Sequence, residues 1–171
     1  MKDVVIVSAT RTPIGDFGGS LKDVSATSLA MTVIDSSLQR VGIEKRSVEQ
    51  VIMGNCFEPL DQNVARIAAV KCGLPLETPG FTIVVNCASG MQAMICGIQA
   101  IRDGDVEVVI AGGVESMSTA PYILTTTRWG QRLQHGQLID MLWRAMHARR
   151  IRFPSFSRMS TAGAIPFSND T

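Results

Sequence analysis

Short apolar runs alternate with amphipathic helical patterns over residues 4–111, and this alternation constrains the fold more than any other feature. Runs rich in β-branched residues predict strands at 4–7, 50–55, 81–85 and 106–111. Apolar residues spaced three and four apart predict helices at 25–41, 63–72 and 88–102. Because strands and helices alternate, we expect an α/β layered sheet with helices on both faces.

Length and composition fit a globular chain of one domain with part of a second. The 171 residues are 46% apolar and 18% charged, which excludes a disordered protein. No apolar run approaches the ~18 residues of a membrane span, and the apolar run in MKDVVIVSAT is too short for a signal peptide. Four cysteines form no CxxC pair, and two histidines provide no zinc-ligand spacing. We therefore expect no metal, no membrane partner, and reduced thiols in a cytoplasmic protein.

Cys87 is the strongest candidate for chemistry, because it stands between the predicted strand 81–85 and the predicted helix 88–102. The positive end of a helix favours thiolate over thiol, as a nucleophilic cysteine requires. The competing interpretation is a small buried hydrophobe, which describes most cysteines. Asn55 and the stretch 112–115 also follow strand ends, where ligands gather in sheets of this kind. This shared position favours a functional Cys87.

Four motifs in the same order resemble the first half of the thiolases, the acetyl-CoA acyltransferases and acetyltransferases. They are SATRTPIGDFGGSL (8–21), VIMGN (51–55), VVNCASGMQAM (84–94) and VVIAGGVESMSTAPY (108–122). The stretch RWGQRLQHGQLIDMLW (128–143) resembles the start of that family's loop domain. The resemblance implies one half of a thiolase-like layered fold, with a mixed sheet and helices on both faces, plus a partial loop domain.

The resemblance also implies roles for particular residues. Cys87 matches the nucleophile that takes an acyl group from acyl-CoA, with coenzyme A thioesters as substrates and no separate cofactor. Its backbone N–H would contribute to an oxyanion hole, and Gly90 would allow close packing at the turn. Arg11, Asn55 and the loop 112–118 match family positions that we interpret as architectural. The setting implied is fatty acid metabolism.

The chain also departs from the family pattern. The second half of a thiolase supplies a base in a Gly-His-Pro motif, a second catalytic cysteine and an asparagine, and none of these motifs occurs here. His135 is interpreted as a solvated or interface residue and Cys96 as a core residue. His147 falls in the divergent tail, and Cys56 and Cys72 have no partner in the sequence pattern that would give them a chemical role. General acid–base catalysis typically contributes ~10²–10⁴ in rate, so we expect this chain alone to have almost no turnover.

The predicted organisation is an α/β domain over 1–118, the start of a loop domain over 119–143 and a divergent, poorly ordered tail over 144–171. The tail holds five arginines and one acidic residue. A basic patch for coenzyme A phosphates or nucleic acid, and ordinary loop variation, are the lesser alternatives. The favoured hypothesis is a truncation or a frame change near residue 144, with no nucleic-acid partner.

Two further hypotheses for the function stay open. One is a non-catalytic partial chain that assembles or aggregates, because the apolar side of helix 88–102 would lack a covering partner. Such an exposed patch predicts a homo-oligomer if the chain folds. The other is a β-ketoacyl synthase, which resembles thiolases in fold and in its cysteine. The stretches Arg11–Pro13 and Glu115–Ser118 favour a thiolase.

Overall fold

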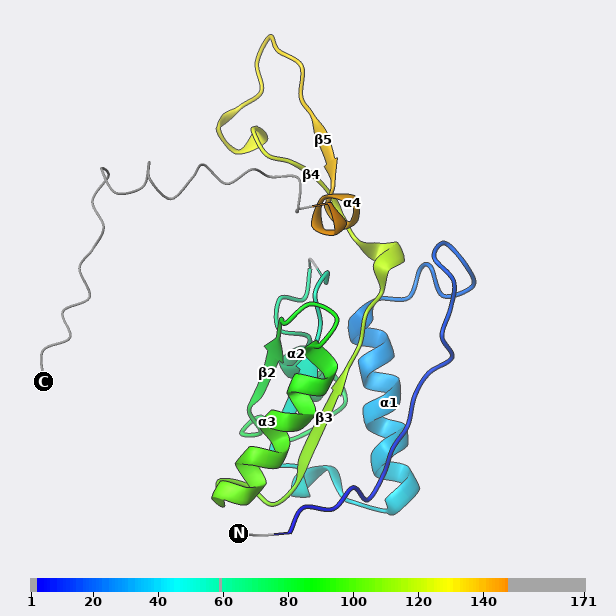
Figure 1. Ribbon diagram of the computed structural model, residues 1–171, viewed down its shortest axis with the longest axis vertical. Coiled ribbons are helices and arrows are strands. Elements are labelled where there is room, and N and C mark those ends of the chain that lie inside the picture. The colour runs from blue at the N-terminus through cyan, green and yellow to red at the C-terminus, as the bar shows by residue number, and fades with distance from the viewer. Residues whose placement is uncertain (1–2, 59, 148–171) are drawn as a thin grey trace, which may run out of the picture.

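The computed structural model describes residues 3–58 and 60–147, which form a three-layer α/β arrangement with a hairpin above one end (Figure 1). The α-helices are α1 (Ala26–Val41), α2 (Val64–Lys71), α3 (Ser89–Asp103) and α4 (Met141–Met146). The strands are β1 (Gln50–Gly54), β2 (Gly80–Ile83), β3 (Val109–Gly113), β4 (Tyr122–Leu124) and β5 (Leu138–Asp140). Three short 3-10 helices are η1 (Lys45–Ser47), η2 (Met117–Thr119) and η3 (Thr127–Trp129). No helix in these ranges is long and apolar enough to cross a membrane.

The main sheet has the order β2-β1-β3, and both strand pairs are parallel. β1 lies in the centre, with Ile52 paired to Phe81 on one side and to Ala111 on the other. The layered α/β fold is therefore confirmed. The main sheet is not mixed as expected, because both of its strand pairs are parallel. Within residues 3–58 and 60–147, the antiparallel pair lies in the separate β4–β5 hairpin.

The core lies between the sheet and the layer formed by α1 and α2. Its members are small or branched apolar side chains, among them Ala30, Ile34, Val51, Val64 and Ala68, each fully buried. Ser25 caps the start of α1 by accepting a hydrogen bond from the Ser28 backbone N–H, and Gly42 ends it in the left-handed conformation. Asn63 caps α2 in the same way, by accepting from Arg66 N.

Among the described elements, α3 covers the opposite face of the sheet (Figure 1). It approaches β3 closely because Gly97 has no side chain: a Cβ there would lie 3.1 Å from Val109 and 3.4 Å from Ala111. α3 carries the exposed apolar side chains Met91, Met94 and Ile95. The expectation of an uncovered apolar patch on this helix is thus confirmed for three of its four residues, while Ile98 is half-buried.

The predicted first strand, residues 4–7, is wrong. Residues 3–15 are extended but make no backbone–backbone hydrogen bond to any described strand. Val5, Ile6 and Val7 are 73%, 81% and 61% exposed. Side chains fasten this segment to α1 instead: Thr10 donates to the Val33 carbonyl at 3.1 Å, and Arg40 donates to the Ala9 carbonyl at 2.9 Å. An apolar run forms a strand only where a neighbouring strand pairs with it, and no described strand pairs with residues 4–7.

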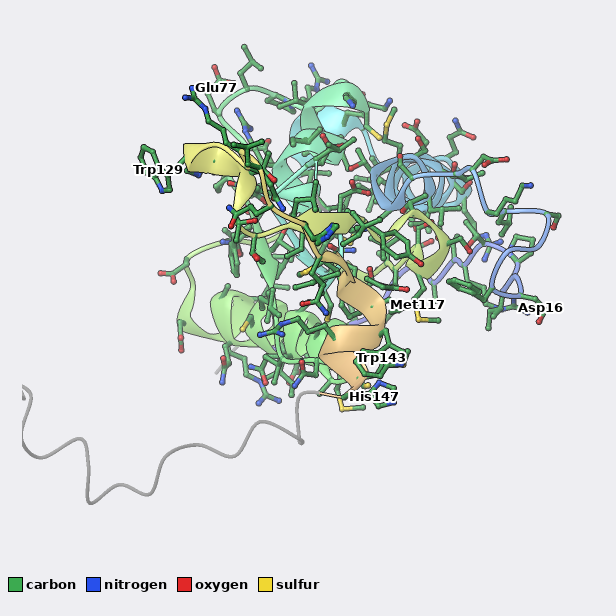
Figure 2. All side chains as sticks on the ribbon, turned by 90° about the horizontal axis from the view of Figure 1, so that it is seen from above. Asp16, Glu77, Met117, Trp129, Trp143 and His147 are labelled. Atoms are coloured by element: carbon green, nitrogen blue, oxygen red, sulfur yellow. The ribbon has the colours of Figure 1, made fainter. Side chains whose placement is uncertain are left out.

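Residues 119–147 form the β4–β5 hairpin followed by α4. β4 covers Tyr122–Leu124, and α4 begins at Met141, directly after β5. Asp140 sets this start by accepting hydrogen bonds from Leu142 N and Trp143 N at 2.9 and 3.1 Å. Trp143 and His147 stack on α4 with ring centroids 4.2 Å apart (Figure 2). Most of the tail predicted over 144–171 lies outside the described residues.

Candidate functional site

A tight turn between β2 and α3 presents Cys87 to solvent. Asn86 adopts a left-handed backbone with φ of 50°, which asparagine tolerates better than most residues. The Ser89 hydroxyl closes the turn: it accepts from Val85 N at 2.8 Å and donates to the Asn86 carbonyl at 2.6 Å. The sequence expectation of a cysteine exposed where a strand passes into a helix matches this geometry.

Two glycines bring the start of α3 against the ends of β1 and β3. A Cβ on Gly54 would lie 2.5 Å from Gly90 N and still closer to the Ser89 carbonyl carbon. A Cβ on Gly113 would lie 2.9 Å from the Gly90 Cα. Real side chains cannot occupy such positions, so the absence of both Cβ atoms fixes the place of Cys87. Sequence reasoning named Gly90 as the close contact, but the tightest positions are on the two strands.

Glu115 organises the loop beside the cysteine. Its carboxylate accepts hydrogen bonds from Cys56 N at 2.8 Å, from Phe57 N at 3.2 Å and from the Asn55 side chain at 3.1 Å. Asn55 also donates to the Val114 carbonyl at 2.9 Å and is only 6% exposed. Asn55 and Glu115 thus brace the ends of β1 and β3. The architectural interpretation of Asn55 and of the loop 112–118, which contains Glu115, agrees with these contacts.

A cavity of about 640 Å³ opens beside Cys87. Its walls come from the turn, from the loop after β1, from the segment after β3 and from α4 above them. The wall includes the side chains of Cys56, Phe57, Cys87, Met117, Leu142 and Met146. This wall is mainly apolar, so the cavity suits an organic group attached to the sulfur better than a bare ion.

Three of the other titratable candidates, His135, His147 and Cys72, lie outside the cavity of Cys87. Neither His135 nor His147 lines its cavity, and His147 instead hydrogen-bonds the Trp143 carbonyl through Nδ1 at 2.8 Å. Cys72 is buried in the core, where burial and, to a smaller extent, the Asp35 carboxylate raise its pKa to about 11. Within residues 3–58 and 60–147, no group of three or more His, Cys, Asp or Glu side chains could hold a metal ion.

Cys56 and Cys96 differ in their distance from the site. Cys56 lines the same cavity as Cys87, with its Sγ 3.5 Å from the Asn86 carbonyl oxygen and 3.7 Å from Ser89 Oγ. Cys96 lies two turns along α3 and accepts a hydrogen bond from Gln92 at 3.6 Å. Sequence spacing gave no signal for the proximity of Cys56, because β1 and α3 meet only in the folded chain.

Comparison with known proteins shows the family to which the sequence is similar. Residues 4–151 match the family described as "Thiolase, N-terminal domain". An acetyl-CoA acetyltransferase from Pseudomonas aeruginosa is 46% identical over 143 residues, covering 83% of this chain and 36% of that protein. The beta-ketothiolase BktB from Cupriavidus necator is 43% identical over 148 residues, covering 85% of this chain and 38% of that protein.

Solved structures agree with the sequence matches. The crystal structure of the Bacillus anthracis acetyl-CoA acetyltransferase has a TM-score of 0.77 at 48% identity, covering 82% of this chain and 36% of that one. The crystal structure of human mitochondrial 3-ketoacyl-CoA thiolase has a TM-score of 0.79 at 38% identity, covering 86% and 38%. The chain therefore spans little more than a third of the length of these relatives.

Proposed function

This chain belongs to the thiolase family through that family's N-terminal domain, and from this premise we propose that it is a thiolase-type acyltransferase with Cys87 as the acyl acceptor. The substrates are coenzyme A thioesters of acetyl or 3-ketoacyl groups, and the reaction needs no further cofactor. The two relatives named acetyl-CoA acetyltransferase and 3-ketoacyl-CoA thiolase support this substrate class.

One observation carries the proposal: Cys87 is an exposed thiol at the start of a fifteen-residue helix and on the wall of an apolar cavity. Exposure lets a large thioester reach the sulfur. The helix start offers backbone N–H groups and a partial positive charge to an anion. The apolar wall gives the acyl group a surface to pack against once it is attached.

The proposed step is transfer of an acyl group between two sulfur atoms. The Cys87 thiolate attacks the thioester carbonyl carbon, and a new carbon–sulfur bond forms while the carbonyl oxygen gains negative charge. We propose that the backbone N–H of Cys87 donates a hydrogen bond to that oxygen. Collapse of the adduct breaks the bond to the sulfur of coenzyme A, which leaves as a thiolate and takes up the proton released by Cys87.

We propose that the 171 residues perform this half-reaction and do not complete a condensation or cleavage cycle. The next step needs a group that removes a proton from the second acetyl-CoA. Neither histidine lines the cavity, and the second cysteine there, Cys56, has no described proton-accepting partner besides the Asn86 carbonyl and the Ser89 hydroxyl. We therefore expect no detectable turnover of acetoacetyl-CoA.

Intact-mass spectrometry after incubation with acetyl-CoA tests the half-reaction. We expect a single adduct of about 42 Da, the mass that one acetyl group adds to a thiol nucleophile. The Cys87→Ala variant loses this adduct. Cys56→Ala is the matched control, because it removes a thiol from the same cavity and leaves the adduct in place.

Absence of the adduct from the unaltered protein would overturn the acyl-acceptor role and leave a non-catalytic chain. An adduct that persists in Cys87→Ala and disappears in Cys56→Ala would transfer the role to the neighbouring thiol. A measurable rate with acetoacetyl-CoA would show that these residues contain a proton-transfer group that the contacts above do not reveal.

The assembly and location complete the proposal. The exposed Met91, Met94 and Ile95 on α3 favour a homo-oligomer, and a monodisperse monomer in light scattering would contradict it. A role in fatty acid metabolism in the cytoplasm stays a prediction of the sequence and of the family.

A further inference from the structure

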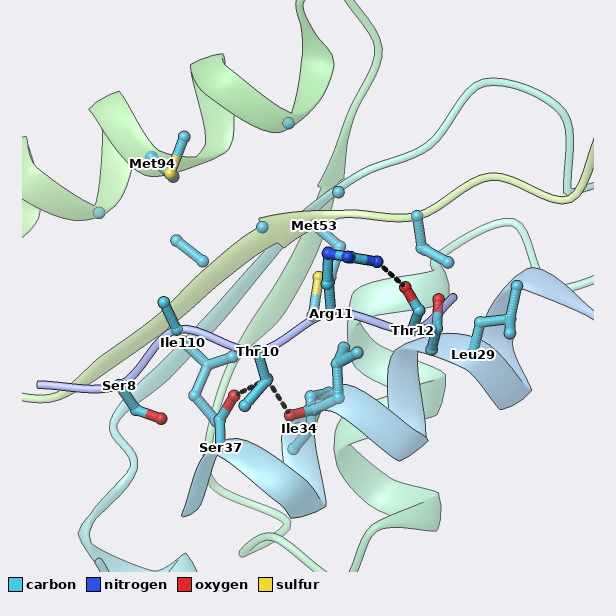
Figure 3. Close-up of a pocket in the computed structure, with 18 of the residues that line it drawn as sticks. Ser8, Thr10, Arg11, Thr12, Leu29, Ile34, Ser37, Met53, Met94 and Ile110 are labelled. Atoms are coloured by element: carbon cyan, nitrogen blue, oxygen red, sulfur yellow. Dashed lines mark hydrogen bonds between the residues drawn. The ribbon is translucent and has the colours of Figure 1, made fainter. Parts of the chain in front are cut away.

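Two of the four cysteines, Cys56 and Cys87, line the same cavity beside the turn between β2 and α3. A larger cavity of about 1050 Å³ lies between α1, β3 and the N-terminal segment (Figure 3). No cysteine is among the described residues that line it, and there Thr10 and Ser37 hydrogen-bond to each other. Two thiols on the wall of one cavity can react with each other, which a single thiol cannot do.

The Cys56 sulfur contacts the turn that carries Cys87. It lies 3.5 Å from the carbonyl oxygen of Asn86, the residue before Cys87, and 3.7 Å from Ser89 Oγ. The Asn86 carbonyl oxygen and the Cys87 Cα belong to one planar trans peptide and lie about 2.8 Å apart. The Cys56 sulfur is therefore within about 6.3 Å of the Cys87 Cα.

The backbones of both cysteines are held in place, while their side chains border open space. Glu115 accepts a hydrogen bond from Cys56 N at 2.8 Å, and the N–H of Ala88 donates to the Val85 carbonyl at 3.1 Å across the turn. A change of χ1 between staggered rotamers moves a cysteine sulfur by about 3 Å. The cavity provides space for this rotation, so the arrangement favours a disulfide formed by rotamer changes.

The other two cysteines are poor partners for Cys87. Cys72 is 5% exposed and belongs to the core between the sheet and α1. Cys96 lies about 10 Å farther along α3 than Ser89, at a rise of ~1.5 Å per residue. The Cα atoms of a disulfide lie no more than about 7 Å apart. Among the described thiols, Cys56 is therefore the one placed to reach Cys87.

We propose that Cys56 and Cys87 form a reversible disulfide when the protein meets a peroxide, with Cys56 as the thiol that resolves oxidised Cys87. Cys87 reacts first, because it is exposed and stands at the start of α3, where the helix favours the thiolate. Cys56 is half-buried in the same wall and reacts second. The disulfide itself does not depend on acyl transfer. Its consequence rests on the proposed function, because a sulfur in a disulfide cannot accept an acyl group.

The reaction has two steps and consumes one hydrogen peroxide. In the first step the Cys87 sulfur attacks one peroxide oxygen, a sulfur–oxygen bond forms, and the oxygen–oxygen bond breaks. The hydroxide that leaves takes up the thiol proton and becomes water. In the second step the Cys56 sulfur attacks the sulfur of the Cys87 sulfenic acid, and the sulfur–sulfur bond forms. Hydroxide leaves again and takes the Cys56 proton, so the thiols lose two electrons and two protons and the peroxide gains them.

Alkylation with N-ethylmaleimide in denaturant, followed by intact-mass spectrometry of the full chain, counts the free thiols. The reduced protein has four cysteines and should gain four maleimide groups. After about one equivalent of hydrogen peroxide we expect this count to fall by two, which corresponds to one disulfide. Trypsin cleaves after Arg66 and Lys71, which lie between Cys56 and Cys87, so the disulfide should join two tryptic peptides. Dithiothreitol should restore the original count.

Three serine variants identify the two partners. Cys87→Ser and Cys56→Ser should each abolish the linked peptides. In Cys56→Ser, sulfinic acid on Cys87 should accumulate about tenfold more than in the unaltered protein, because an unresolved sulfenic acid reacts with further peroxide. Cys96→Ser is the matched control, since it removes a thiol of α3 outside the cavity, and it should keep the link. Circular dichroism confirms that the variants are folded.

Acetylation separates this inference from the proposed function. Peroxide treatment should reduce the adduct of about 42 Da formed with acetyl-CoA by about tenfold or more, and dithiothreitol should restore it. A disulfide in a protein that never forms the acetyl adduct supports this inference and overturns the acyl-acceptor role. An acetyl adduct in a protein that never forms the disulfide supports that role and overturns this inference.

Three further results would overturn the disulfide. The first is equal accumulation of sulfinic acid on Cys87 in the unaltered protein and in Cys56→Ser. The second is a peptide link that persists in Cys87→Ser or disappears in Cys96→Ser. The third is a disulfide between two chains, which a non-reducing gel shows as a dimer.

Discussion

β1 and the N-terminal segment have similar sequences and opposite environments. Gln-Val-Ile-Met-Gly forms a central strand in which Val51, Ile52 and Met53 are at most 2% exposed. Val-Val-Ile-Val at residues 4–7 is extended and mostly exposed, with Ile6 at 81%. The difference lies in their neighbours, because β1 has a strand on each side and no described strand pairs with the N-terminal segment. Strand composition alone therefore decides neither pairing nor burial.

The largest expected effect comes from a substitution at Gly54, which tests how closely α3 packs on the end of β1. Gly54→Ala places a Cβ where backbone atoms of Ser89 and Gly90 lie. Because both obstacles are backbone, we expect a loss of about 4 kcal/mol or more in the free energy of unfolding. Urea denaturation followed by circular dichroism measures it.

Gly112→Ala is the matched control in the same sheet. Its Cβ would meet only the Met53 sulfur, at 3.8 Å, so the free energy of unfolding should change by less than about 1 kcal/mol. Equal losses in the two variants would contradict the packing argument and would indicate a general requirement for glycine in these strands.

A pair of identical substitutions addresses the opening comparison directly. Ile52→Ala removes a side chain that is fully buried in β1 and should cost about 2–5 kcal/mol. Ile6→Ala removes the same atoms from an exposed position and should change stability by about 0.5 kcal/mol or less. A cost at Ile6 close to that at Ile52 would show that the N-terminal segment is buried in solution.

The last expected effect is a loss of stability at alkaline pH, and it arises from a thiol that is buried in the core. Burial raises the pKa of Cys72 from its usual 9.0 to about 11. An unfolded chain releases this proton first, so stability is unaffected below pH 9 and falls as the pH rises from about 9 to about 11. Two pKa units correspond to about 2.7 kcal/mol, which partial solvation near the thiol reduces to about 1–2 kcal/mol.

Urea denaturation at a series of pH values measures this loss. Cys72→Val removes the titrating group and should flatten that part of the profile. A profile that is unchanged in Cys72→Val would assign the alkaline loss to other groups.

The helices and the central strand could be predicted from the sequence because their signals are local. α1, α2, α3 and β1 each begin and end within one residue of their predicted bounds. β3 was predicted at 106–111 and lies at 109–113, since the apolar run starts before the ladder with β1 does. The β4–β5 hairpin was missed because each of its strands has only three residues, too few for a periodic pattern.

The site could be predicted only in part, for a similar reason. Cys87 was found because its motif and its place between a strand and a helix are both local. The close approach of Gly54 and Gly113 to α3, and the hydrogen bonds of Glu115, join residues far apart in the sequence. A single sequence without geometry contains no signal for these contacts.

The order of the strands also affects how the chain folds. β2 follows β1 directly and lies beside it, so this pair and α2 can form as soon as residue 83 has been made. β3 must reach the other side of β1, and the hydrogen bond between Cys56 N and Glu115 spans 59 residues. Closing such long loops slows folding relative to local contacts. The Cys87 turn is braced from the β3 side, so we expect it to reach its final geometry late in folding.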